Sequence, residues 1–216
     1  MPNTPAVNAL PLSVILLILP IIGVEAYIAG AEARLWGNFD ARINLITAIG
    51  VLPDPVQYTI TSGRFDIGWL QTLLLYPFVH GVFLQTVFAS MFLLALGKFV
   101  GEAMGDITVL AIFFISSLLG ALAYVGLLSD NYPLFGAYPA AYGMIGGYTY
   151  ILYAIAGDTR DQQIRAFQLI AVIMAINLGF ALISGGPAIW VAELTGAVAG
   201  FATAAAMHGL LRRRHR

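Results

Sequence analysis

The chain has 216 residues, of which 60% are apolar and only 10% are charged, and its mean hydropathy is +0.86. Ordinary soluble domains contain roughly 45–50% apolar and about 25% charged residues, so this composition excludes a water-soluble globular fold. The 10 Lys and Arg residues balance 11 Asp and Glu residues, which argues against a nucleic-acid partner, and the absence of Cys excludes disulfides and thiolate chemistry. The remaining class is a polytopic helical membrane protein.

Six apolar stretches are long enough to cross the hydrocarbon core of a bilayer as helices, which takes about 20 residues each. The stretches are residues 9–29, 70–97, 107–128, 135–156, 166–184 and 188–211. We therefore predict an all-α integral membrane protein in which residues 1–216 form one domain, a bundle of six transmembrane helices. The first stretch lacks the basic leader of a signal peptide, so we interpret it as a retained span.

The connection between the first two stretches, from Glu32 to Ile67, is too long to be a simple turn. Apolar residues alternate there with Arg42 and Asn44, until Pro53 and Pro55 interrupt the pattern. A segment of this composition is typical of the membrane interface rather than of free solvent. We expect this loop to be partly embedded in the membrane.

The basic residues predict the orientation, because short cytoplasmic loops collect Lys and Arg. With six spans, seven of the ten basic residues fall on the side of the termini, and the other three lie in the long first loop. The seven are Lys98, Arg160, Arg165, Arg212, Arg213, Arg214 and Arg216. We expect a multi-pass protein of a bacterial inner membrane with both termini in the cytoplasm.

A few polar side chains fall inside the predicted spans, where an ionisable group costs on the order of 3 kcal/mol and usually faces the bundle interior. Glu193 lies near the start of the sixth stretch, followed by Gly196 and Gly200, whose spacing favours close helix packing. His80 and Gln85 lie in the second stretch, on different faces of the expected helix. We interpret the lone His80 as a hydrogen-bonded structural residue, and we predict no cofactor and no metal site.

Three motifs occur in a fixed order along these stretches. His80 opens the first, residues Gly136 to Gly143 form the second, and residues Ala192 to Gly200 form the third. In this order they resemble the rhomboid family of intramembrane serine proteases, which has a His followed by His-x-x-x-Asn, then Gly-x-Ser-Gly-Ala-x-x-Gly, then Ala-His-x-x-Gly-x-x-x-Gly. The resemblance covers nearly the whole chain, and it implies a six-helix bundle with a long first loop.

The positions that carry catalysis in that family hold other residues here. The resemblance places the nucleophilic Ser at Tyr138 and the general base at Glu193, and it places the oxyanion donors at Gln85 and Ala89. Acyl transfer needs a nucleophile, a base and oxyanion donors, and a phenol is a poor acyl-transfer nucleophile. The resemblance therefore implies a pseudoprotease without catalytic residues. The polar residues that remain for a partner-binding cluster are His80, Gln85, Tyr138, Tyr142 and Glu193.

The resemblance also implies a contact, because the nucleophile and the base of that family are within hydrogen-bonding reach. We expect Tyr138 and Glu193 to be neighbours, with the Tyr138 hydroxyl donating to the Glu193 carboxylate directly or through one water. Such a bond would connect the fourth span to the sixth at the place where catalysis would occur.

Three functions are compatible with these features. We expect a non-catalytic membrane protein that contacts membrane lipid and binds transmembrane helices of client or partner proteins, for quality control, assembly or sequestration. One alternative is an intramembrane endopeptidase that uses another nucleophile. The serines available to it are Ser90, Ser116, Ser117 and Ser184. A weaker alternative is a transporter with Glu25 and Glu193 along a polar path.

Overall fold

The structure is a computed structural model, and it describes residues 9–63, 67–128, 132–184 and 188–214. These residues form helices joined by short connections, with one isolated antiparallel bridge between Val51 and Leu134. The elements are α1 (Leu12–Glu32), α2 (Ala41–Ile49), α3 (Pro53–Ser62), α4 (Ile67–Leu75), η1 (Tyr76–Phe78), α5 (Phe83–Met104), α6 (Asp106–Leu127), α7 (Tyr138–Ala156), α8 (Arg160–Ala166), α9 (Gln168–Ser184) and α10 (Trp190–Arg214).

Four of these helices, α1, α5, α6 and α10, are long and apolar enough to cross a membrane. The predicted class of an all-helical integral membrane protein is therefore supported. Helices α7 and α9 coincide with the fourth and fifth predicted stretches but are not among those four, so the count of six spans stays a prediction. Most of α7 is buried among its neighbours, and a helix enclosed by protein needs little apolar surface of its own toward lipid.

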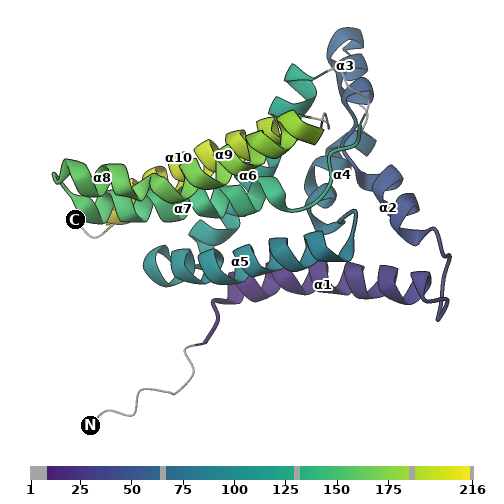
Figure 1. Ribbon diagram of the computed structural model, residues 1–216, viewed down its shortest axis with the longest axis horizontal. Helices are drawn as coiled ribbons and strands as arrows, with labels where there is room; N and C mark the ends of the chain where they lie inside the picture. The colour runs from purple at the N-terminus through teal and green to yellow at the C-terminus, as the bar shows by residue number, and fades with distance from the viewer. Residues whose placement is uncertain (1–8, 64–66, 129–131, 185–187, 215–216) are drawn as a thin grey trace.

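The helices form two side-by-side groups that meet at α5, α6 and α7 (Figure 1). In one group α10 lies along α7 and α6, with α9 beside α7 and α10; in the other, α1 lies along α5. The largest apolar core joins the two groups, since it contains Val14 of α1, Leu93 of α5, Ile112 of α6 and Met144 of α7. This arrangement places α5, α9 and α10 around α7, and the candidate site lies near the start of α7.

The bounds predicted for the second span are wrong. Residues 70–97 do not form one helix, because α4 ends at Leu75, a 3₁₀ turn follows, and α5 begins only at Phe83. Pro77 has no backbone N–H to donate, and the chain is extended at the residues that flank His80 and Gly81. His80 therefore precedes α5, and its expected position on a helical face is wrong as well.

The long first loop contains the two helices α2 and α3, and it is joined to the rest of the protein at defined points. The Val51–Leu134 bridge, with N···O distances of 2.9 Å in both directions, attaches it to the chain just before α7. The following 3₁₀ turn is held by Tyr76, whose buried hydroxyl donates to the Ser117 carbonyl of α6 at 2.7 Å. The loop is thus a folded part of the bundle.

Helices α7 and α10 touch backbone to backbone through their glycines. A methyl group placed on Gly200 would overlap the carbonyl oxygen of Gly143, and one placed on Gly146 would overlap the carbonyl oxygen of Ala197. A methyl group on Gly196 would overlap the carbonyl oxygen of Pro139 in the same way. The interpretation of Gly196 and Gly200 as packing residues is confirmed. The contact fixes the distance between the first turn of α7 and the first turns of α10.

This contact predicts that two alanine substitutions in the same helix differ in their effect on stability. Gly200→Ala should destabilise the protein by about 1–3 kcal/mol, the usual cost of overpacking, because the two backbones must separate. The matched control is Gly209→Ala, also in α10, where an added methyl group meets nothing within 4 Å; it should be neutral or slightly stabilising. Thermal unfolding of both variants in detergent measures the difference, and equal unfolding temperatures would contradict the close contact.

Candidate functional site

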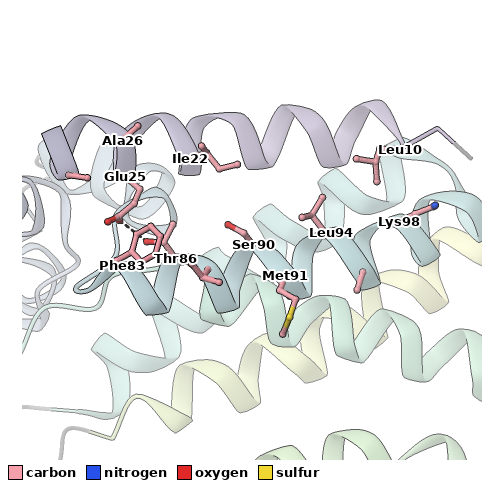
Figure 2. Close-up of a pocket in the computed structure, with 13 residues that line it drawn as sticks. Leu10, Ile22, Glu25, Ala26, Phe83, Thr86, Ser90, Met91, Leu94 and Lys98 are labelled. Carbon is pink, nitrogen blue, oxygen red and sulfur yellow. Dashed lines mark hydrogen bonds between the residues drawn. The ribbon is translucent and has the colours of Figure 1, made fainter. Parts of the chain in front are cut away.

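A buried ion-pair cluster lies where α1 leads into the long loop. Its centre is Arg42 of α2, whose five N–H groups all donate to protein oxygens. Two go to Glu32 (2.8 and 3.1 Å), two to Glu25 (2.8 and 3.1 Å), and one to the backbone carbonyl of His80 (2.9 Å). Glu25 also accepts a hydrogen bond from Thr86 of α5 at 2.7 Å, drawn in Figure 2. The cluster joins α1, α2 and the start of α5.

The inner pair of this cluster, Arg42 with Glu25, is shielded from water, whereas the second carboxylate, Glu32, is 38% exposed. The side chain of Glu25 is only 6% exposed and that of Arg42 only 12%. The hydrogen bonds to Glu32 and Glu25 raise the pKa of Arg42 above its already high usual value, so the guanidinium stays charged. Removing one partner of a buried pair costs roughly 3–5 kcal/mol, because the other charge is left uncompensated. Glu25, the residue suggested for a transport path, is thus held in an ion pair.

His80 connects this cluster to the start of α7. Its Nε2 accepts a hydrogen bond from the backbone N–H of Ala137 at 3.2 Å, and its ring meets the ring of Tyr138 edge to face at 6.5 Å between centroids. The chain passes close to the imidazole at Gly136, whose φ of +90° favours glycine. These contacts agree with the interpretation of His80 as a hydrogen-bonded structural residue. Its Nδ1 is buried with no partner among the described residues.

The two positions that the resemblance equates with oxyanion donors have structural roles. The side-chain oxygen of Gln85 accepts a hydrogen bond from the backbone N–H of Gly81 at 3.0 Å, which satisfies a donor just before α5. Ala89 is fully buried in the apolar core between α1, α5 and α7, and its methyl group has no donor.

A second polar cluster lies between α7, α9 and α10. The side-chain nitrogen of Asn177 in α9 donates to the Glu193 carboxylate of α10, and it also lies 3.1 Å from the Tyr142 hydroxyl of α7. The direct hydrogen bond that we expected from Tyr138 to Glu193 is not formed; Asn177 is the donor. The first turns of α7 and α10 nevertheless touch, since a methyl group on Gly196 would overlap the carbonyl oxygen of Pro139, so the expected closeness of the two helices at this point is present.

Sequence reasoning missed Asn177 and Arg42 as members of these clusters. Asn177 is the polar side chain within the apolar run of α9, a signal of the same kind that drew attention to Glu193. In the sequence, Arg42 is one of several polar residues among the apolar residues of the long first loop, and nothing marks it as the centre of a cluster. The partners of both residues come from other helices, and sequence spacing does not predict such pairs.

Three of the four serines considered as alternative nucleophiles have no base beside them. The Oγ atoms of Ser90, Ser116 and Ser117 are buried, and none has a hydrogen-bond partner in the part of the chain that the structure describes. A serine nucleophile needs an adjacent base that takes its proton. The side chain of Ser184 lies outside the described residues. Among the described residues there is also no group of three or more His, Asp or Glu side chains that could hold a metal ion.

Comparison with known protein families matches the Rhomboid domain to residues 68–210, more than half of the chain. The matched region contains the His80 turn, the start of α7 and the glycines of α10. It leaves out α1 and Arg42 of the long loop, which supply most of the ion-pair cluster. No curated protein matches the chain.

The position of Asn177 predicts which substitutions affect stability. Asn177→Leu leaves the buried Glu193 carboxylate without its donor and should lower the free energy of unfolding by about 1–3 kcal/mol. Tyr138→Phe, the matched control, removes a hydroxyl that does not bond to the carboxylate and should change stability little. Replacing both Asn177 and Glu193 by Leu should recover most of the loss. Unfolding in detergent micelles tests the series, and a large effect of Tyr138→Phe alone would assign the donor role to Tyr138.

Proposed function

Because the chain belongs to the rhomboid family, we propose that it is a non-catalytic member that binds transmembrane segments of client or partner proteins. The observation that carries the proposal is the bonding of Glu193. This residue, at the position that the resemblance gives to the general base, is engaged by Asn177. Tyr138, at the position of the nucleophile, has its ring against His80. Both positions have contacts that support the fold rather than a reaction.

Elementary chemistry supports the same conclusion. Hydrolysis of a peptide bond needs a nucleophile whose proton passes to a base, and donors aimed at the oxyanion. The Glu193 carboxylate accepts its hydrogen bond from Asn177, none from the Tyr138 hydroxyl is formed among the described residues, and the side-chain oxygen of Gln85 is bonded to the Gly81 N–H. Loss of one member of a catalytic triad lowers the rate by several orders of magnitude. Here all of these positions differ.

The surroundings of the α7–α9–α10 cluster favour an apolar helical partner. Half-buried side chains of α5, including Phe92, and of α9, including Met174, lie around Tyr142. A helix that approached there would find apolar side chains for packing, because the polar groups of Tyr142 and Glu193 are buried beneath them and bonded to Asn177. Helix association in bilayers depends largely on tight packing, and this face offers it.

The apolar helices and the family together make this an integral membrane protein. We propose in addition six spans with both termini in the cytoplasm of a bacterium. The unequal distribution of Lys and Arg between the two sides supports this orientation.

Catalytic inertness can be tested directly. The purified protein, reconstituted in liposomes with a fluorogenic transmembrane substrate, should produce no cleavage above that of empty liposomes. Tyr138→Ser should not restore cleavage, because Glu193, Gln85 and Ala89 are unchanged. Cleavage by the unmodified protein that is lost in Ser116→Ala would instead establish the alternative of an endopeptidase with another nucleophile.

Binding of client helices can be tested by site-specific crosslinking. A photoreactive phenylalanine analogue at Phe92 of α5 or Met174 of α9 should form adducts with single-span membrane proteins when the full chain is expressed in a bacterial membrane. The same analogue at Leu119, which α6 exposes away from this cluster, is the control and should form few. Equal adduct yields at all three positions would contradict binding at the α5–α9 face.

A further inference from the structure

A long apolar groove runs between α1 and α5 on the outside of the bundle, away from the α7–α10 cluster. Its volume is about 780 Å³. The helices are antiparallel, since Val14 lies near Gly97 at one end and Glu25 bonds Thr86 at the other. Figure 2 shows the lining side chains from Leu10 and Lys98 at one end to Glu25 and Phe83 at the opposite end. The groove is therefore open to lipid along the length of the helix pair.

The length of the groove fits a single extended hydrocarbon chain. The lining positions on α5 extend from Phe83 to Lys98, about 22 Å along a helix that rises 1.5 Å per residue. Half of the hydrocarbon core of a bilayer measures about 15 Å. A chain that enters at the Lys98 end therefore lies in the groove over the full depth of its leaflet before it reaches the Glu25–Thr86 bond.

The chemistry of the lining favours lipid over a helix from another protein. The Glu25 oxygens accept hydrogen bonds from Arg42 and Thr86, and the Ser90 Oγ is covered by neighbouring atoms. The middle of the groove thus presents apolar surface, including Ile22 and Leu94, and gives a partner helix no polar group to bond. Without such bonds a helix gains little over the lipid chains that it displaces.

The charged end of the groove specifies a headgroup. Lys98 carries the cation, and Glu102 follows one turn later on the same face of α5, with 3.8 Å between Nζ and Oε1. Both side chains are partly exposed, at 33% and 42%. Glu102 lies nearer the end of α5 at Met104 and therefore nearer to water. The pair has no net charge, so it complements a headgroup that carries a phosphate and a cation, and it disfavours a headgroup with only negative charge.

We propose that the α1–α5 groove binds one acyl chain of a phospholipid with a phosphate and a primary ammonium in its headgroup, as in phosphatidylethanolamine. The phosphate pairs with Lys98, which extends its ammonium toward the interface, and the lipid ammonium pairs with Glu102. The site is separate from the α7–α10 cluster, so the proposal does not depend on the function proposed above.

The test uses the full chain in vesicles of equal parts phosphatidylethanolamine, phosphatidylglycerol and phosphatidylcholine. One lipid at a time carries a photoreactive diazirine near the end of an acyl chain, and crosslinked peptides are identified by mass spectrometry. The phosphatidylethanolamine probe should label peptides of α1 and α5 more strongly than either other probe. Glu102→Gln and Lys98→Gln should each reduce this preference by about threefold, the effect expected of one exposed ion pair.

Two further variants separate the site from general lipid contact. Ala95→Trp fills the groove one turn from Lys98 and should abolish labelling of α1 and α5, whereas Leu119→Trp on the exposed face of α6 should leave it unchanged. The unfolding temperature of each variant shows whether the fold is intact, and the two charge variants, which lie at the surface, test the headgroup even if Ala95→Trp fails to fold. Equal labelling by all three lipids, stronger labelling by phosphatidylglycerol, or labelling that persists in folded Ala95→Trp would overturn the proposal.

Discussion

The architecture depends on the close approach of α7 and α10. Glycines let the two backbones touch at three points where any side chain would separate them. The three points are Gly200 against Gly143, Gly146 against Ala197, and Gly196 against Pro139. In a bilayer no hydrophobic force drives helices together, so close packing of this kind supplies much of the attraction. The contact fixes the first turns of both helices, where Tyr138 and Glu193 lie. Helices α6 and α9 then pack beside this pair, and the α1–α5 pair joins it through α5 and α6.

The sequence predicts those parts of the fold that depend on local pattern. The apolar runs locate α6, α7 and α10 to within three residues of their observed bounds. The break before α5 is not predicted, because the run from Leu70 to Gly97 is apolar on both sides of it. Hydropathy alone does not show whether an apolar run continues as one helix or turns. Pro77 is the local signal of the break, since it has no backbone N–H to continue a helix.

The candidate site is predictable in its members but not in its bonds. Resemblance to a family predicts Tyr138 and Glu193 to be neighbours across α7 and α10, and the contact between Gly196 and the Pro139 carbonyl agrees with the closeness of the two helices there. The donor to Glu193 comes from a third helix, and Arg42 reaches partners on α1 and beside α5. A buried charge is costly without a partner, so the fold places one beside it. Which side chain becomes the partner depends on the tertiary arrangement of the helices.

The Glu25–Arg42 pair also has a consequence for how the protein is made. Arg42 follows Glu25 by 17 residues, so α1 leaves the ribosome before the cation that neutralises its carboxylate. A charged residue at the centre of an inserting helix costs on the order of 3 kcal/mol, and α1 bears a cost of this kind until α2 folds back against it. The apolar residues of α1 are sufficient for a span, and folding of the long loop then supplies the cation that pairs with the carboxylate of this helix. Because the loop is made after α1, its Arg42 completes the ion pair of a helix that is already synthesised.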